Sequence, residues 1–469
     1  MTESVVTSWV GTEFELDVES IAHGGHCVGR HAGRVVFVRH ALPGERVVAR
    51  VTEDRGGSFC RADAVSVLRA SESRVEPPCP YAHPGGCGGC DLQHASPAAQ
   101  RALKASVVEE QLVRLGGLSA SSVAEVFAGV EELPGGSLGW RTRVRFAVDA
   151  AGRAGLHPHR SRAVLPVESC PIADPRIDAI GVTHLGWPGV GSVEAVASAA
   201  GDDAVVLEAP SEGRVGRGGG AGSGRGRDGG GRGRDGGGGR GRDRRDRRDS
   251  RRERTVVVEL PEELPETVAV VKAGADSVRG HRRVREVAAG RRWLVRADGF
   301  WQVHPAAPDA LVTAVTEALA PQPGESVLDL YAGAGLFAGV LASAVGEYGR
   351  VVAVESDRGA CDDARRNLRD TPWASVVVGR VDSALSSGLP EPVDLVVLDP
   401  PRSGAGAAVV RAVASRSPRA IAYVACDPAA FARDVATFAE VGYALQRVRA
   451  FDAFPMTHHV ECVGTLIRS

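Results

Sequence analysis

Apolar and polar residues alternate with a period of two along the first part of the chain, which is the pattern of short, half-buried β-strands. Gly24 with Gly25, and Pro43 with Gly44, supply turns between these runs. The strand-like runs lie at 14–18, 34–38, 45–51 and 62–67. Several short strands so close together predict a small closed β-barrel over residues 1–70.

A different pattern begins near residue 295, where buried strand-like runs alternate with stretches of helical length. The strands are predicted at 326–330, 351–355, 393–398 and 420–424. The helices are predicted at 305–320, 336–345, 358–369, 405–416 and 428–440. Such alternation predicts an α/β fold with an open, doubly wound, Rossmann-like sheet over 295–469, and ligands should bind at the carboxyl ends of its strands.

The stretch 71–294 has a mixed pattern. A cysteine-rich loop at 79–90 precedes a helix predicted at 96–116, and strand-like alternation follows, which together predict a β-rich central domain. A segment at 211–254 interrupts it, and within this segment residues 214–254 hold 15 Arg and 16 Gly and almost no apolar residue. We predict that this segment is disordered. Nonspecific contacts to RNA phosphates and a tolerated surface insertion are both compatible with its composition.

Length and composition narrow the class of protein. The 469 residues are enough for two to four domains with ample core. No apolar run approaches the ~18 residues of a membrane span, and no basic-then-apolar leader is present. We therefore expect a soluble, cytoplasmic, monomeric protein that does not contact a membrane. In such a protein the nine cysteines are better suited to metal binding and catalysis than to disulfides.

A glycine loop follows the first strand of the α/β region. Asp329 ends that strand, and Gly333 and Gly335 allow a tight turn in which the backbone can approach a ligand. Glu355 ends the next strand, where it can bond a ribose diol, and Asp382 can bond an adenine amino group or cap a helix. The loop lacks the third glycine of dinucleotide-binding loops, and an acid here would repel a pyrophosphate. S-Adenosylmethionine is therefore favoured over NAD.

Two candidate catalytic groups lie at later strand ends. The turn 399–402 reads Asp-Pro-Pro-Arg, and its prolines hold Asp399 rigidly at the end of the strand predicted at 393–398. Cys426 follows the next strand, and a thiolate there can add to C6 of a pyrimidine so that C5 accepts a methyl group. A separate base must then remove the C5 proton, and Glu461, which opens the last predicted strand, is a candidate. The alternatives are a small buried apolar residue for the cysteine and a strand-edge charge for the glutamate.

At this point the chain resembles known families. The region 295–469 resembles the uracil-5 RNA methyltransferase family in the stretches 300–304, 328–335, 399–404, 423–429 and 459–461. The N-terminal region resembles the TRAM domain, an RNA-binding barrel, in the stretches 22–25, 29–30, 34–38 and 41–45. With the cysteine loop, the resemblance covers nearly the whole chain except 211–254.

The resemblance implies a three-part enzyme: a TRAM-like barrel, a central domain at 71–294 and a class I methyltransferase domain. It implies methyl transfer from S-adenosylmethionine to C5 of a uridine in transfer or ribosomal RNA, with Cys426 as nucleophile and Glu461 as base. The residues expected to line the cofactor and base sites are Gln302, Tyr331, Gly333, Gly335, Glu355, Asp382 and Asp399.

Two functions other than uracil methylation remain open, and the first of them depends on departures from the family pattern. His304 and Leu336 stand where many members have asparagine, which puts polar contacts to the cofactor or base in doubt. They leave room for a noncatalytic RNA-binding or redox-sensing protein of the same fold. A cytosine-5 RNA methyltransferase is the other alternative, but Asp399 occupies the place of its expected second cysteine, so uracil is favoured.

The remaining motif is a set of cysteines. Cys79, Cys87 and Cys90 are close in sequence, and Cys170 is far downstream. Four thiolates with one distant member suit an iron–sulfur cluster or a structural zinc, and His83 is an alternative zinc ligand. Because the family includes members with a four-iron cluster, the resemblance favours [4Fe–4S] over zinc.

Overall fold

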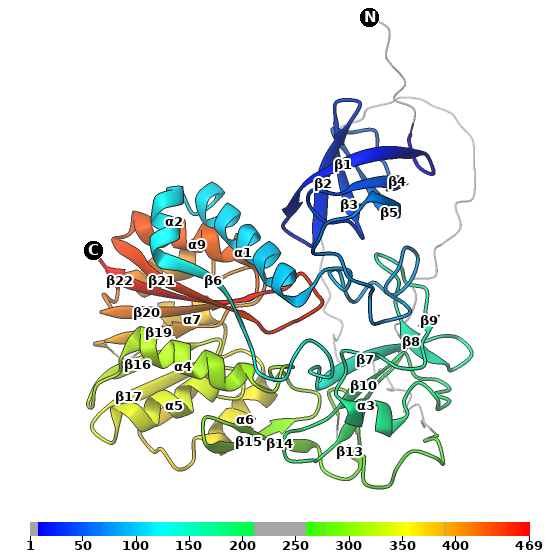
Figure 1. Cartoon of the computed structure of the whole chain (residues 1–469). Helices are drawn as coiled ribbons and strands as arrows, with labels where there is room; N and C mark the ends of the chain where they lie inside the picture. The colour runs from blue at the N-terminus through cyan, green and yellow to red at the C-terminus, as the bar shows by residue number, and fades with distance from the viewer. Residues whose placement is uncertain (1–7, 211–258, 276, 390) are drawn as a thin grey trace, which may run out of the picture.

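The computed structural model describes residues 8–210, 259–275, 277–389 and 391–469. Figure 1 shows a small barrel, a second sheet with long loops beside it, and a large sheet covered by helices. The segment for which disorder is predicted falls within 211–258, outside the described residues. In the part of the chain that is described, no helix combines the length and the apolar character needed to cross a bilayer.

The N-terminal part is a closed five-stranded barrel with the strand order β1-β2-β3-β5-β4, which confirms the predicted barrel. Its strands are β1 (Glu13–Ala22), β2 (His26–His31), β3 (Arg34–Arg39), β4 (Arg46–Glu53) and β5 (Phe59–Arg69). Alternate residues such as Leu16, Val18, Val36 and Val38 point inward and are buried. The alternating pattern did not single out β2, because most of its residues are polar or glycine; it is a strand through its backbone pairing with β1 and β3.

Helix α1 (Pro97–Arg114) lies between the barrel and the large sheet (Figure 1). The Ser96 side chain caps its first turn, and Pro97 is its first residue, close to the predicted start of the helix at 96–116. The helix packs against β1 on one side and α9 (Pro428–Glu440) on the other. Its buried Lys104 donates from Nζ to Oδ1 of Asp452 at 2.6 Å. α1 therefore contacts both the barrel and the C-terminal part of the chain.

The central part is built on a sheet whose described strands have the order β13-β12-β11-β10-β7-β8-β9. Its elements are β7 (Arg143–Val148), β8 (Ala154–Leu156), β9 (Leu165–Pro166), α3 (Pro175–Ile180), β10 (Ser192–Val196), β11 (Ala204–Glu208), β12 (Ala269–Lys272) and β13 (Ser277–Arg279). β11 and β12, which flank the undescribed segment in sequence, pair in parallel. The hairpin of β14 (Arg283–Ala288) and β15 (Arg291–Arg296) then leads into the large sheet.

The C-terminal part is an eight-stranded sheet with the order β18-β17-β16-β19-β20-β22-β21-β6. Its strands are β16 (Ser326–Leu330), β17 (Arg350–Glu355), β18 (Ala374–Val378), β19 (Leu395–Leu398), β20 (Ala420–Ala425), β21 (Tyr443–Asp452), β22 (Glu461–Arg468) and β6 (Phe127–Glu132). Its helices are α4 (Ala307–Leu319), α5 (Leu336–Val345), α6 (Arg358–Asn367), α7 (Val381–Ser386), α8 (Ala407–Ala414) and α9. This is the predicted Rossmann-like α/β architecture.

Both faces of this sheet are covered. In β16, Leu328 and Leu330 enter the apolar cluster that contains α8 and α9 residues, whereas Val327 enters the cluster of α4 and α5. Strands buried on both faces are almost wholly apolar, which explains their clear sequence signal. β6 gave no such signal. It comes from far upstream, after the short helix α2 (Ala120–Val126), and pairs in parallel with β21 at the sheet edge.

Candidate active site

A cleft of about 990 Å³ lies at the carboxyl ends of the parallel strands, where a doubly wound sheet is expected to bind ligands. Most of the residues predicted for the site line it: Gln302, Tyr331, Gly333, Glu355, Asp382, Asp399, Cys426 and Glu461. Gly335 lies behind this lining, at the start of α5 with φ 87°. A Cβ there would lie 3.3 Å from Cβ of Ala364, so its close packing on α6 favours glycine.

The glycine loop is held by a buried carboxylate. Asp329 accepts a hydrogen bond from the Ala338 amide at 2.7 Å, which ties the end of β16 to the first turn of α5. Desolvation raises the pKa of Asp329 to about 7. Tyr331 has φ 66°, an uncommon conformation for a residue with a side chain, and Gly333 has φ 53°. The chain therefore turns tightly at Tyr331 and Gly333, and both of these residues line the cleft.

Glu355 is oriented by backbone amides at the end of β17. Its Oε2 accepts from Gly333 N at 3.0 Å, and its Oε1 accepts from the amides of Ser356 and Asp357 at 2.6 and 2.7 Å. These contacts hold the carboxylate at the rim of the glycine loop. The position matches that of an acid that bonds a ribose.

Asp382 also lines the cleft, in the first turn of α7 (Val381–Ser386). It is not the helix cap, which is Arg380. Its carboxylate accepts from the Arg380 guanidinium at 2.8 Å and from Ser383 N at 2.7 Å. The hydrogen bond to Arg380 is the main reason that the pKa of Asp382 falls to about 2. The group is therefore ionised at neutral pH and able to accept a hydrogen bond from a ligand.

The Asp-Pro-Pro-Arg turn closes the end of β19. The Asp399 amide donates to Leu330 O at 3.2 Å, which places its side chain beside the glycine loop. Desolvation raises the pKa of Asp399 to about 7. Arg402 is exposed and lies 3.2 Å from Nε2 of His459, on the segment that leads into β22. The turn therefore connects the cofactor side of the cleft to the segment carrying Glu461.

Cys426 and Glu461 are brought together by strand pairing. β20 and β22 are antiparallel, with Ala425 opposite Cys462, so the residue after β20 meets the first residue of β22. Burial raises the pKa of the Cys426 thiol to about 11, with smaller contributions from the charges of Glu461 and Asp399. Glu461 is buried, and desolvation raises its pKa well above the ordinary value. The cysteine and the glutamate that the sequence predicts as nucleophile and base thus both line the cleft.

Sequence reasoning missed a second cavity beside Cys426. It has a volume of about 230 Å³ and also touches Arg402, so the cysteine and the arginine line both spaces. Its other walls are the turn between β1 and β2, part of α1, and His458 with His459. No local sequence signal connects a barrel turn to a cysteine some 400 residues away, so only the folded chain reveals this wall.

The two departures from the family pattern lie outside both cavities. His304 is buried, stacks on Trp140 with 5.8 Å between ring centroids, and accepts from Ala306 N through Nδ1 at 3.2 Å. Leu336 is the first residue of α5 and packs in the apolar cluster beneath it. Both residues therefore serve packing at helix starts. They no longer argue for a noncatalytic protein.

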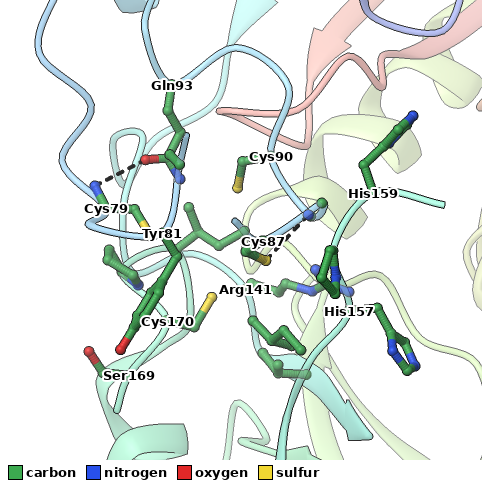
Figure 2. A pocket seen from close by; sticks show the side chains of 18 of the residues that line it. Cys79, Tyr81, Cys87, Cys90, Gln93, Arg141, His157, His159, Ser169 and Cys170 are labelled. Carbon is green, nitrogen blue, oxygen red and sulfur yellow. Dashed lines mark hydrogen bonds between the residues drawn. The ribbon is translucent and has the colours of Figure 1, made fainter. Parts of the chain in front are cut away.

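The four predicted cluster ligands line one cavity of about 340 Å³, in which Cys79, Cys87, Cys90 and Cys170 surround a common space (Figure 2). Burial raises the pKa of Cys90 to about 12 and of Cys170 to about 11, so the neutral thiols are favoured here and ionised thiolates would require a nearby positive charge. Among the residues the structure describes, no group of three or more His, Cys, Asp or Glu side chains is placed to hold a single metal ion. His83 is not part of the lining; its Nδ1 lies 2.9 Å from Pro84 O.

Family models match at both ends of the chain. A TRAM domain model matches residues 8–65, and a tRNA (Uracil-5-)-methyltransferase model matches residues 392–469. A model of Protein-L-isoaspartate(D-aspartate) O-methyltransferase matches residues 301–395, which hold the glycine loop. The TRAM match covers most of the barrel, the match at 301–395 covers the glycine loop, and the match at 392–469 covers Cys426 and Glu461.

Whole-chain comparisons agree. An uncharacterised RNA methyltransferase of Streptomyces avermitilis is 46% identical, covering 97% of this chain and 98% of its own. The 23S rRNA (uracil(1939)-C(5))-methyltransferase RlmD of Alkalilimnicola ehrlichii is 31% identical over 97% and 96%. The crystal structure of Pyrococcus abyssi tRNA (uracil-54, C5)-methyltransferase with S-adenosyl-L-homocysteine shares the fold, with a TM-score of 0.64, 20% identity and coverage of 97% and 100%.

The Alkalilimnicola ehrlichii protein is more than 30% identical over almost the full length of both chains, so the similarity is not confined to a single domain. The match covers 97% of this chain, so it spans the barrel, the central part and the α/β part. The chain therefore belongs to the uracil-5 RNA methyltransferase family.

Proposed function

We propose that this protein transfers the methyl group of S-adenosylmethionine to C5 of a uridine in RNA through a covalent bond between Cys426 and C6. The observation that carries the proposal is the placement of Cys426 next to Glu461 by the β20–β22 pairing, in the cleft that the glycine loop also lines. A pyrimidine C5 is a poor nucleophile, so it needs the nucleophile and the separate base that this pair provides.

Each residue has a distinct task. Cys426 adds its thiolate to C6, which turns C5 into an enolate carbon that accepts the methyl group. The sulfonium of S-adenosylmethionine supplies that methyl group as an electrophile. Glu461 then takes the proton from C5, and the electron pair of that C–H bond restores the ring double bond while the bond between Cys426 and C6 breaks. The thiolate is regenerated, and the proton leaves Glu461 to water.

The electrostatics of the cleft support this sequence. In the free protein, desolvation favours the neutral forms of Cys426, Asp399 and Glu461, and repulsion from Asp399 adds to this effect at Cys426 and Glu461. A cationic sulfonium in the cleft would favour the ionised forms of all three. Arg402 adds a positive charge near both Cys426 and Glu461. Nucleophile activation would therefore depend on cofactor binding.

The direct test is base analysis of RNA after reaction. Unmodified 23S ribosomal RNA and transfer RNA transcripts, the substrate classes in the names of the Alkalilimnicola ehrlichii and Pyrococcus abyssi proteins, would be incubated with the protein and S-adenosylmethionine carrying a labelled methyl group. We expect labelled 5-methyluridine in one of them by mass spectrometry of nucleosides. Labelled 5-methylcytidine would instead favour the cytosine reaction, and no labelled pyrimidine would refute the proposal.

Glu355 offers a test of the cofactor position. We expect Glu355→Ala to weaken binding of S-adenosylhomocysteine by about 10- to 100-fold in calorimetry, because hydrogen bonds to a charged carboxylate contribute about 1.5–3 kcal/mol. Asp362→Ala is the matched control, since Asp362 is exposed on the neighbouring helix α6 and outside the cleft. Equal affinities for the two variants would contradict the assignment of Glu355.

We further propose that Cys79, Cys87, Cys90 and Cys170 hold a [4Fe–4S] cluster. A tetrahedral zinc with bonds of about 2.3 Å requires four sulfur atoms within about 4 Å of one another. The side chains here instead surround a cavity of about 340 Å³ and are not gathered around one point. A four-iron cluster spreads its thiolates, because each binds a different iron, and this suits the wider space.

Protein purified without oxygen is therefore expected to contain about four irons per chain and to show the broad visible absorbance of such a cluster. Cys87→Ala should lose both iron and absorbance. Cys60→Ala, which removes a buried thiol from the barrel far from this cavity, should keep both. Stoichiometric zinc without iron in the wild-type protein would contradict the cluster.

A further inference from the structure

The turn between β1 and β2 reaches out of the barrel and touches both segments that carry the proposed catalytic pair. On one side, Nε2 of His23 lies 3.0 Å from Oδ2 of Asp427, the residue directly after Cys426. On the other, a Cβ placed on Gly25 would lie 2.7 Å from Cβ of His458, so the turn packs closely against the segment before Glu461. The barrel is therefore part of the wall of the active site.

Asp427 is held at both of its carboxylate oxygens. Its Oδ1 accepts from Ala430 N at 2.8 Å and caps α9, whereas its Oδ2 faces His23 of the barrel. Because β20 ends at Ala425 and α9 begins at Pro428, only Cys426 and Asp427 lie between strand and helix. A shift of Asp427 would therefore move the thiol of Cys426 directly.

The other segment is fixed in a similar way. Nδ1 of His458 lies 2.5 Å from Oδ2 of Asp91, and Arg39 of β3 lies 3.6 Å from the other oxygen of Asp91. The barrel turn, His458 and Cys426 together enclose the second cavity of about 230 Å³. The contact between His23 and Asp427 closes this space on the side of the nucleophile. The position of the barrel thus affects the position of the cysteine.

We propose that His23 is a positioning residue, whose hydrogen bond to Asp427 holds the Cys426 side chain in the orientation required for attack and couples the RNA-binding barrel to the nucleophile. This assignment rests on the proposed function, since it takes Cys426 as the nucleophile. His23 is part-exposed, with 38% of its side chain accessible, so its removal costs little core packing. Its effect should therefore appear in catalysis and not in folding.

The test separates positioning from RNA binding. We expect His23→Ala to lower the single-turnover rate of methyl transfer about tenfold, with less than a twofold change in KM for RNA, because the loss of one orienting bond misplaces the nucleophile. His23→Gln should recover most of the rate, since its amide nitrogen can still donate to Asp427. His184→Ala, an exposed histidine of the central domain, should match the wild type.

A double-mutant cycle tests whether the effect passes through Asp427. Asp427→Ser keeps a side chain that can cap α9 but is too short to reach His23. The pair His23→Ala with Asp427→Ser should be no slower than Asp427→Ser alone. Independent losses that multiply, a wild-type rate for His23→Ala, or a rise in KM alone would overturn the assignment. A wild-type protein that methylates no uridine would refute the proposed function itself.

Discussion

Replacing Cys426 with alanine is expected to abolish methyl transfer and covalent capture of RNA that carries 5-fluorouridine at the target. Fluorine at C5 cannot leave as a proton does, so the wild-type adduct should be trapped and survive denaturing electrophoresis. Without the thiolate no bond to C6 forms, and C5 stays unreactive. The loss of rate should be at least about 10⁴-fold, as for other removed nucleophiles.

Cys462→Ala is the matched control for this experiment. Cys462 is a buried cysteine at the adjacent position across the β20–β22 pairing, but it does not line the cleft. The Cys462→Ala variant should therefore still form the trapped adduct and keep most of the rate of methyl transfer. A Cys426→Ala protein that methylates RNA at the rate of this control would rule out the covalent route.

The state of the thiol adds a second measurement to the same prediction. Because burial raises the pKa of Cys426 to about 11, its thiolate fraction in the free protein should rise with pH throughout the range in which the protein stays folded. Alkylation of the Cys426 peptide, followed by mass spectrometry, should therefore quicken steadily with pH. A plateau near the ordinary cysteine pKa of about 8.5 would show that burial is not what controls this thiol.

Replacing Glu461 with glutamine is expected to stall the reaction after methyl transfer. The C5 proton would stay in place, the bond between Cys426 and C6 could not break, and a methylated protein–RNA adduct should accumulate with ordinary uridine RNA. Turnover should fall by about 10²–10⁴-fold, the usual contribution of a general base. Denaturing electrophoresis of single-turnover samples would reveal the adduct as a slowly migrating band.

Folding should be little affected by this change. Glu461 is buried and desolvation raises its pKa, so glutamine replaces a side chain of nearly the same shape whose charged form is already disfavoured by burial. Glu440→Gln, on the exposed end of α9, is the control for the chemical change alone. If Glu461→Gln turns over at the control rate and no adduct accumulates, the proton acceptor must be another group, such as Asp399.

Much of the fold could be predicted from the chain because its signals are local. Alternation marked the barrel, and strands buried on both faces of the large sheet gave apolar runs that periodicity detects. β2 and β6 gave no comparable signal, because each is a strand only through the neighbours with which its backbone pairs. β18 and β21 are also missing from the strands predicted from the sequence.

The sequence by itself determined which side chains gather at the cleft, since Glu355 ends a strand, Asp399 and Cys426 each follow one, and these parallel strands end at a common edge of the sheet. Only the tertiary structure decided what depends on contacts between distant segments. It placed Glu461 beside Cys426, gathered Cys170 with the cysteine loop, and set His23 against Asp427. The periodicity of a segment reflects which of its side chains face the core of its own domain. Contacts between distant segments depend instead on how the separate domains pack against one another.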